Sequence, residues 1–593
     1  MFIDKEACIA YGSYEKNGEG SVTRDMTFTG NTAAGCPFAG IIAPGEDCDE
    51  ADPVQFKNNV AHSVDGYGIY AYPNPASTTS GNCFKFGYAT AYKTVQASIF
   101  TMPDTKLLKA HHLTALDSQK GISLNTGGSE KDDVEIILSD SFFFGETAAN
   151  DCPSIEAGKC VCQQKYTFMN GQNMNDMKSL MPTAASQLPL YGSHGEGNWG
   201  GKVTINDCTF SKFQGLSACG EKSTLLASNP KSSDKIPPHF FNNCILEDVD
   251  DNGFAFLVKP NPGWANVKDC GNFPCTAPNN LIFSFAGTQW KGTTPTSTPE
   301  AFVVIPNEAT VGGTYDACVE RPDQQAMICE MDNIGMMMFE NLDVDAWDRA
   351  IQPVFLLNEA TGFNNTVNAM MDHIWDTFYT GQKRMARFPT ALATGQDYVL
   401  EFSGTPPKKI RFGLEARVGG TMITIPYPVA GSVRVKIDGK TVDPNGWDEE
   451  IGKPAALTKD KGCGENRFVG VENYLDFWLE PGCVLNIEPK DSIMAKVRMD
   501  WTLAEFYSDG GTTRFVDRLA ASLGIASHRV KVVAIYEGST VVDFEIEKEE
   551  PEAVATEDEN GDPISAEDQA AALLAAQTKA TEALASIKTL MVT

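Results

Sequence analysis

The sequence predicts a mainly-β fold: a right-handed parallel β-helix, then a β-sandwich, a small α+β unit and a C-terminal helix. Three observations support this prediction. Two segments, at 26–42 and 54–70, repeat each other at an offset of 28 residues. Many short apolar strands alternate with turns in a chain that holds 52 Gly and 32 Pro. Near residue 364 the repeat ends and strands of alternating polarity begin.

The repeat predicts stacked coils. In its first copy Phe28, Asn31, Ala33, Gly40 and Ile41 match Phe56, Asn59, Ala61, Gly68 and Ile69 in the second. One such unit cannot bury its apolar face alone, so its copies must stack on each other. Later echoes with unequal loops extend the predicted β-helix over residues 1–362. A propeller or a set of sandwiches is the alternative, but the unit recurs too closely for sandwiches.

The rest of the chain predicts five further segments. Residues 363–394 form a connecting or capping segment, and alternating apolar strands over 395–490 predict the β-sandwich. Residues 491–547 predict a strand, an amphipathic helix ending at Gly524 and a β-hairpin. An acidic linker over 548–563 leads to an Ala-rich helix over 564–593, which opens with a capping box at Ser565.

Composition excludes several classes of function. The formal net charge of −31 argues against electrostatic binding of nucleic acid or anionic lipid. No run of eighteen apolar residues occurs, so we expect no membrane span in this chain. The N-terminus lacks the basic and apolar regions of a signal peptide. Because the cysteines and the sequon described below indicate an extracellular protein, the lack of a signal peptide predicts that this chain is a mature product or a piece of a larger protein.

The sixteen cysteines favour structural disulfides and an oxidising compartment. No CxxC pair occurs and only seven His are present, which makes a zinc site a poor explanation. The sequon at Asn364 agrees with secretion and predicts a glycosylation site. The disulfide candidates fall into loose local groups: Cys36 and Cys48; Cys152, Cys160 and Cys162; Cys208 and Cys219; Cys270 and Cys275; Cys318 and Cys329; Cys463 and Cys483.

Candidate acids and bases are scattered along the predicted coils. They are His62, Asp65, His111, His112, Asp117 and Asp140. The structural interpretation is that His62 caps a turn, that the paired His lie on opposite strand faces, and that the Asp residues end turns. We favour it, because neither a spaced carboxylate pair nor a Lys–Arg constellation accompanies them.

Two polar clusters admit structural interpretations. Residues 248–253 begin like an EF-hand calcium loop, but Lys259 stands where Glu is required and strands flank the loop, which excludes an EF-hand. A looser calcium site would use Asp248, Asp250 and Asn252, and an ordinary Asp-rich turn accounts for the same residues. Separately, turn asparagines predict a hydrogen-bonded ladder between coils, formed by Asn31, Asn58, Asn59, Asn242 and Asn243.

Several segments resemble the extracellular fibrocystin and fibrocystin-like proteins. They are NNVAHSVDGYGI (58–69), DCGNFPCTAPNN (269–280) and the hairpin-bearing end, within a resemblance over roughly 25–547. The resemblance implies a secreted or membrane-anchored ectodomain with parallel β-helix repeats, of which this chain is a downstream fragment. Related β-helix proteins occur on the surfaces and cilia of protists.

A short motif near the C-terminus resembles the self-cleaving SEA module of mucins. Gly538-Ser539 would be cleaved when the Ser hydroxyl attacks the preceding carbonyl, although Thr540 departs from the module's pattern. A hairpin turn explains the same residues.

These observations predict a non-catalytic structural or adhesive building block of a cell-surface or flagellar assembly, such as a filament, hair or coat. It would need no cofactor beyond calcium at the loose site, and the C-terminal helix would contact neighbouring subunits. The alternative is a glycan-binding or glycan-degrading protein related to the cell-surface hyaluronidase. Its aromatic platforms would come from Trp264, Trp290 and Trp347.

Overall fold

A computed structural model describes the chain over residues 7–547 with gaps, the longest of which are 11–26, 161–176, 180–201, 251–281 and 368–385. The described residues are mainly β-strands, and one α-helix occurs among them. The chain divides into two compact units, 1–431 with 435–487 and 432–434 with 488–593. Among the described helices, none is long and apolar enough to cross a membrane.

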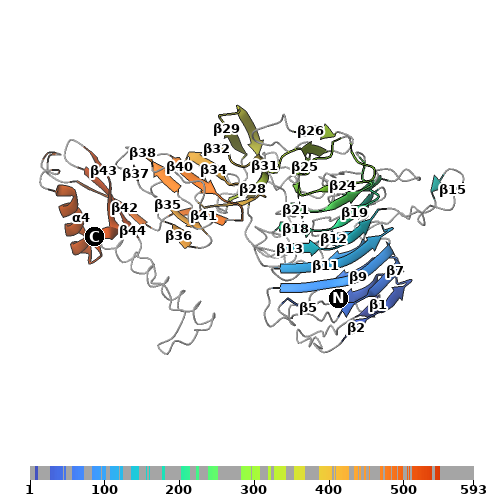
Figure 1. Ribbon diagram of the computed structural model, residues 1–593. Coiled ribbons are helices and arrows are strands. Elements are labelled where there is room, and N and C mark those ends of the chain that lie inside the picture. Colours follow the sequence, from blue (N-terminus) through green and yellow to red (C-terminus); the bar gives the residue numbers. More distant parts are fainter. Residues whose placement is uncertain are drawn as a thin grey trace. The chain divides into compact units, whose positions relative to one another are not determined.

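Parallel strands stack in two columns in the N-terminal part of the first unit (Figure 1). The shorter column contains β1 (Ala7–Ala10), β4 (Ala39–Ala43), β8 (Tyr67–Ala71), β10 (Ala97–Thr101) and β12 (Ile122–Leu124). The longer column begins with β3 (Thr32–Ala34), β7 (Asn59–Val64), β9 (Cys83–Thr94) and β11 (Leu107–Leu116). Beyond β11 it continues as two ladders. One is β13 (Glu135–Ser139), β18 (Lys202–Asn206), β21 (His239–Asn242) and β23 (Phe283–Ala286), and the other is β14 (Phe142–Phe144), β19 (Thr209–Ser211), β22 (Ile245–Glu247) and β24 (Gln289–Lys291).

The register of these strands explains the sequence repeat. Phe28 of β2 (Phe28–Thr29) pairs with Phe56 of β6 (Phe56–Lys57), which is the predicted offset of 28. The next offsets are unequal, because Asn59 pairs with Ala89 and Cys83 pairs with Leu107. Parallel stacking therefore continues past the point where the spacing in the sequence stops being regular.

Left-handed backbone conformations bend the coils, in most of them at two points five residues apart; the coil of Asp140 has only the first. The first set of positive φ angles is at Gly30, Asn58, Tyr88, His112, Asp140, Asp207, Asn243 and Gly287. The second set is at Gly35, Ser63, Lys93, Asp117, Lys212, Asp248 and Gly292. Gly, Asn and Asp adopt this conformation most readily, so they predominate. We call the first set the turn column.

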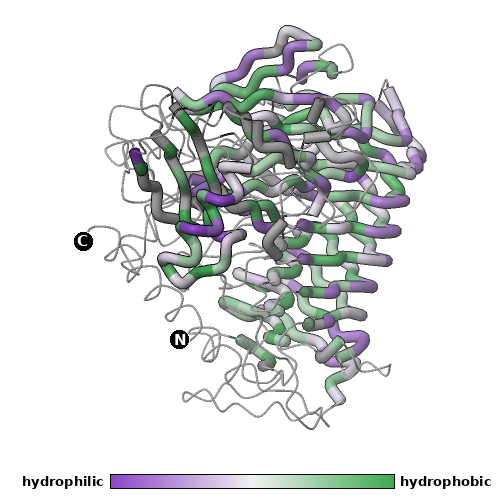
Figure 2. The backbone as a smooth tube through the Cα atoms, turned by 90° about the vertical axis from the view of Figure 1, so that its left-hand side faces the viewer, coloured by the Kyte–Doolittle hydropathy of each residue, from purple (hydrophilic) through white to green (hydrophobic). Residues whose placement is uncertain are grey.

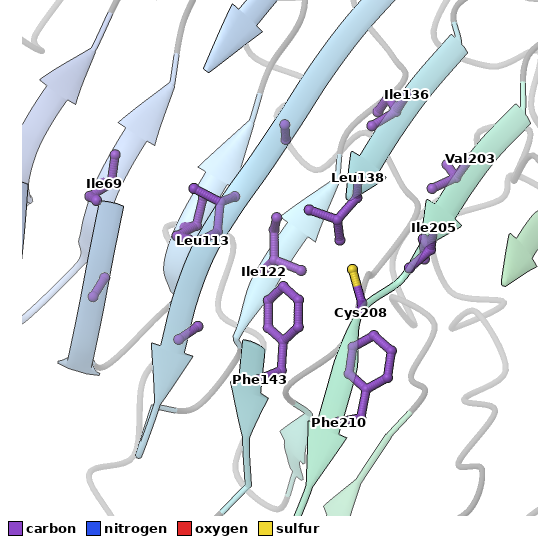
Figure 3. Close-up of a cluster of buried hydrophobic side chains, with 14 of the residues drawn as sticks. Ile69, Leu113, Ile122, Ile136, Leu138, Phe143, Val203, Ile205, Cys208 and Phe210 are labelled. Atoms are coloured by element: carbon purple, nitrogen blue, oxygen red, sulfur yellow. The ribbon is translucent and has the colours of Figure 1, made fainter. Parts of the chain in front are cut away.

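The core runs between the strand columns, and like residues stack from coil to coil. The rings of Phe28 and Phe56 stack at 5.6 Å between centroids, and those of Phe241 and Phe285 stack at 4.2 Å. Figure 2 shows the resulting alternation of hydrophobic and hydrophilic residues along each coil. Figure 3 shows aliphatic side chains, Phe143, Phe210 and the Cys208 thiol meeting in this interior.

The repeated Gly and Ala residues allow two strands to approach closely across this core. A Cβ atom at Gly40 would lie 2.8 Å from Ala61 Cβ, and one at Gly68 would lie 2.7 Å from Ala91 Cβ. Such contacts are too short for real side chains, so a coil closed in this way requires Gly at these positions. The repeat therefore records a packing constraint.

Among the described strands up to β24, the only antiparallel pairs are the short ones of β5 (Glu46–Asp47) with β9 and of β15 (Ile155–Glu156) with β16 (Lys159–Cys160), whereas antiparallel pairing predominates after β24. β25 (Phe302–Pro306) pairs antiparallel with β23 and with β27 (Ala326–Cys329), which in turn pairs with β26 (Cys318–Arg321). Two six-stranded sheets follow. The first is β31 (Ala386–Ala393), β28 (Ile334–Asn341), β33 (Ile410–Glu415), β41 (Val484–Pro489), β35 (Val433–Ile437) and β36 (Lys440–Val442). The second is β30 (Phe363–Val367), β29 (Val354–Asn358), β32 (Asp397–Phe402), β34 (Thr421–Pro426), β40 (Tyr474–Leu479) and β39 (Phe468–Val471).

The change of architecture comes earlier than the predicted boundary at 362. Residues 335–356 fall inside the predicted β-helix, but β28 pairs antiparallel with β31 and β33, and β29 pairs antiparallel with β30 and β32. Continuous apolar strands do not reveal whether their partners are parallel or antiparallel, which explains the error. The last turns of the parallel stack are also bonded to this region, because the Arg417 guanidinium donates to the carbonyl oxygens of Phe241 at 3.0 Å and Ser284 at 2.7 Å.

The second unit contains a three-stranded antiparallel sheet and the helix. Its sheet order is β42 (Ser492–Arg498), β44 (Val541–Glu547), β43 (Val530–Tyr536), and α4 (Gly511–Leu523) lies between β42 and β43 in sequence. The helix ends at Gly524 in a left-handed cap, as the sequence predicts. Ala520 and Phe544 contribute to the small core between helix and sheet.

Several predicted features lie outside the described residues. These are most of the capping segment, the acidic linker, the C-terminal helix, Asn252, Trp264, Trp347, Gly538, Ser539 and the cysteines at 152, 162, 219, 270, 275, 463 and 483.

Candidate functional site

An imidazole and aromatic cluster lies on the outer surface of the stack at the turn column. The Tyr88 and His112 rings stack at 4.6 Å between centroids and 22° between planes. The Lys57 ammonium lies 5.2 Å from the Tyr88 ring centroid, and His111 meets Tyr88 edge-on at 5.1 Å. Three successive coils therefore contribute to one surface cluster.

The two histidines of this cluster lie on the same side of the chain, in contrast to the expectation that they face opposite ways. Their Nδ1 atoms are 3.1 Å apart. Strand alternation fails here because His112 has a φ of 50°, which turns its side chain back toward that of His111. Gly87 provides the space, since a Cβ there would lie 2.7 Å from His111 Nδ1.

The other candidate acids and bases do not join this cluster in a catalytic arrangement. His62 stacks on Tyr92 at 4.9 Å, and its Nδ1 lies 3.2 Å from Ser63 Oγ. Asp117 is buried, whereas Asp65 and Asp140 are exposed. The backbone N–H of Asp140 donates to the Asn206 carbonyl at 3.1 Å, so Asp140 serves the turn column through its backbone.

The predicted asparagine ladder divides into separate contacts. The Asn31 side chain donates to Asn59 Oδ1 at 3.0 Å, and the buried Asn59 amide donates to the Phe28 carbonyl at 2.9 Å. Asn242 donates to Asn206 Oδ1 at 2.8 Å. Asn58 and Asn243 instead occupy the turn column, where their backbone conformation is the important property. Neighbouring asparagines in the sequence thus have different roles.

Asp248 of the predicted calcium site already has a cationic partner. The Asp248 carboxylate forms an ion pair with Lys212 and accepts a hydrogen bond from the Thr293 backbone N–H at 2.8 Å. These contacts, chiefly the hydrogen bond from Lys212, hold the pKa of Asp248 below its ordinary value. In the described part of the chain, no three His, Cys, Asp or Glu residues gather in a metal-binding group. An ammonium group therefore already neutralises Asp248.

Three disulfides are present among the described cysteines: Cys8–Cys36, Cys48–Cys83 and Cys318–Cys329. Only the last joins one of the predicted local pairs, and Cys36 and Cys48 each bond elsewhere. Stacking places residues one coil apart side by side, so Cys8 meets Cys36 at a separation of 28. The offset of 28 could have identified Cys8, whereas Cys83 meets Cys48 at a separation of 35 through the antiparallel pairing of β5 (Glu46–Asp47) with β9. Neither Cys8 nor Cys83 was among the candidates.

Cys208 was predicted as a disulfide candidate, and this prediction is wrong, because its thiol is free and buried. Thr209 pairs with Ile245, so Cys208 stacks in register with Cys244 on the next coil. Cys244 was not among the candidates. Burial raises the pKa of both thiols, that of Cys244 to about 12. These cysteines thus belong to the apolar core.

The predicted carbohydrate features have different outcomes. Asn364 lies in β30 with its side chain exposed. Trp290 is partly buried against the core, and its indole N–H donates to the Pro299 carbonyl at 3.0 Å. It is therefore held by packing on Phe302, at 5.9 Å between centroids, and is a poor platform for a sugar ring.

The comparisons with known proteins agree with the resemblance seen in the sequence. No family model matches the chain. The chain is 25% identical to fibrocystin-L of Homo sapiens over 437 residues, which covers 65% of this chain and 10% of that protein. Fibrocystin-L of Mus musculus matches to the same extent. The chain thus spans about a tenth of the length of these relatives.

The disulfides and the likeness to fibrocystin-L fit an extracellular location. These matches support the assignment of the chain to the fibrocystin-like family.

Proposed function

We propose that this chain is a non-catalytic structural or adhesive building block of a cell-surface or flagellar assembly, such as a filament, hair or coat. Its N-terminal part would be a right-handed parallel β-helix, and the two six-stranded sheets would form a β-sandwich. The approach of Phe412 and Phe477 to 5.0 Å between the two sheets supports the sandwich. The proposal requires no cofactor.

The observation that carries this proposal is the use of repeated polar side chains to bond one coil to the next. Asn31 to Asn59 and Asn242 to Asn206 are such contacts. The Ser141 hydroxyl likewise accepts a hydrogen bond from the Leu113 backbone at 3.0 Å. Groups committed to inter-coil bonds stabilise a rod and leave few polar atoms for chemistry.

Assembly would use the predicted helix over 564–593. Leu573, Ala580, Leu584, Ile587 and Met591 fall on one stripe of that helix. Light scattering after size-exclusion chromatography, together with electron microscopy, would compare the full chain with Leu584→Ala/Ile587→Ala. Glu582→Ala, on the same helix but off the stripe, is the matched control. We expect oligomers to dissociate only in the double variant; oligomers unchanged in it would refute the role of the helix.

The glycan alternative has a direct test. Incubation of the full chain with a panel of polysaccharides would report binding and depolymerisation. Neither is expected of a structural rod. Depolymerisation of any of the glycans would contradict the non-catalytic assignment, and binding without cleavage would redirect the proposal to adhesion through carbohydrate.

The second unit would be an SEA-like module. The order strand, helix, strand, strand and the position of Gly538-Ser539 between β43 and β44 support this proposal. Denaturing electrophoresis and intact mass would detect self-cleavage at that bond. Two fragments in the parent chain and one intact chain in Ser539→Ala are the signature of cleavage, whereas a continuous parent chain would limit the likeness to the fold.

A further inference from the structure

The imidazole pair of the turn column has a geometry suited to a metal ion. Two ligand nitrogens about 2.0–2.1 Å from one ion, at roughly 90–110° to each other, lie about 2.9–3.4 Å apart. The Nδ1 atoms of His111 and His112 are 3.1 Å apart, within this range. At this distance one Nδ1–H donates to the other Nδ1, so one ion could bind both nitrogens once the shared proton leaves Nδ1.

The backbone holds the pair in this arrangement. The turn column is otherwise Gly, Asn or Asp except at Tyr88 and His112, both of which have a φ of 50°. A Tyr and a His adopt this conformation at a cost that Gly or Asn would avoid, so their presence needs a local explanation. The stacking of His112 on Tyr88 and the space over Gly87 fix the two rings relative to each other.

The surroundings leave room for an open site. His112 is exposed and His111 is half-buried. No third His, Cys, Asp or Glu joins them among the described residues, so water would fill the remaining coordination positions. Asp140 occupies the next position in the turn column and adds negative charge one coil further on.

We propose that His111 and His112 form a surface site that binds a divalent first-row transition metal, with Cu²⁺ favoured over Zn²⁺. Imidazole nitrogens suit both metals, and Cu²⁺ forms the stronger complexes with a given nitrogen site. This site is separate from the assembly role proposed above and does not depend on it.

The test is a titration of the full chain with Cu²⁺, and separately with Zn²⁺, near neutral pH against a chromophoric chelator. The variants are His111→Ala and His112→Asn, because Asn tolerates the positive φ. His62→Ala is the matched control, since His62 is a single imidazole stacked on Tyr92 in the same coil stack. Circular dichroism would verify that each variant is folded.

We expect the parent chain and His62→Ala to bind one Cu²⁺ that both test variants lose. Their affinity should fall by at least the roughly 10-fold to 100-fold that the loss of even a supporting residue costs a metal site. Electron paramagnetic resonance of the Cu²⁺ complex should show coupling to two imidazole nitrogens. Equal Cu²⁺ binding in the parent and both test variants, or none in the parent, would overturn the proposal.

Discussion

The ion pair between Glu340 and Arg411 tests whether β28 is an integral strand of the first six-stranded sheet. Glu340 on β28 lies directly opposite Arg411 on β33. The guanidinium contacts Glu340 Oε2 from Nε at 2.7 Å and from Nη2 at 2.5 Å. The Glu340 side chain is 0% exposed and that of Arg411 is 13% exposed. Replacement of Arg411 by Met would remove the cation that directly contacts this buried carboxylate.

The cost of that change follows from burial. Two unit charges about 4 Å apart interact by about 4 kcal/mol at an effective dielectric constant of about 20. Loss of one partner of a buried pair typically costs about 3–5 kcal/mol, because the remaining charge stays desolvated. We expect Arg411→Met to lower the free energy of unfolding of this region by that amount. Glu340→Gln/Arg411→Met should recover most of it, because the charge is removed.

Denaturant unfolding followed by tryptophan fluorescence would measure the change, since Trp478 is buried in β40. Lys202→Met is the matched control, because Lys202 and Glu135 form a pair at 3.6 Å with side chains 43% and 35% exposed. An exposed pair of this kind contributes up to about 1 kcal/mol. If Arg411→Met costs no more than the control, β28 is not integral to the sheet and the reasoning is refuted.

Three further predictions concern the core, the thiols and the surface. Phe241→Ala should destabilise the first unit by about 3–5 kcal/mol because its ring is buried and stacked, whereas Phe142→Ala, 37% exposed, should cost less than about 1 kcal/mol in the same denaturant assay. Burial raises the pKa of Cys244 from 9.0 to about 12, so its contribution to stability should be intact below pH 9.0 and lost as pH rises toward 12. The free energy of unfolding would be measured against pH for the parent chain and for Cys244→Ala. If it falls equally steeply above pH 9.0 in both, the prediction is contradicted. Asn364→Gln should remove one glycan from the chain secreted by a eukaryotic host, and an unchanged mass would show that the sequon is unused.

The resemblance between the two first coils was sufficient to predict how they stack. Phe28 pairs with Phe56 at the predicted offset, and Gly40 and Gly68 mark close approaches across the core. Such positions are constrained residue by residue, because a side chain of another size would not fit between coils. Loops of very different lengths connect the later coils, because a longer surface loop costs little extra free energy to close. The spacing of these strands in the sequence therefore does not predict which residues pair.

The candidate site was harder to predict than the fold. Alternation along a strand predicts that His111 and His112 point to opposite faces, and a left-handed residue reverses this result. Tyr88, His112 and Lys93 occupy positions where Gly or Asn would be expected, so no turn signal marks them. The disulfides were missed for a related reason, because pairing by nearness in sequence ignores nearness between coils.

By itself, the sequence determined that the chain is mainly β, that its N-terminal part repeats, and that helix α4 ends at Gly524. These features depend on local periodicity and on glycine conformation, which are written in consecutive residues. Only the tertiary structure decided that β28 leaves the parallel stack, that Cys208 stays a free thiol and that two imidazoles meet. Those outcomes depend on which distant strands become neighbours, and a neighbour one coil away is separated in this chain by 24 residues in one case and by 67 in another.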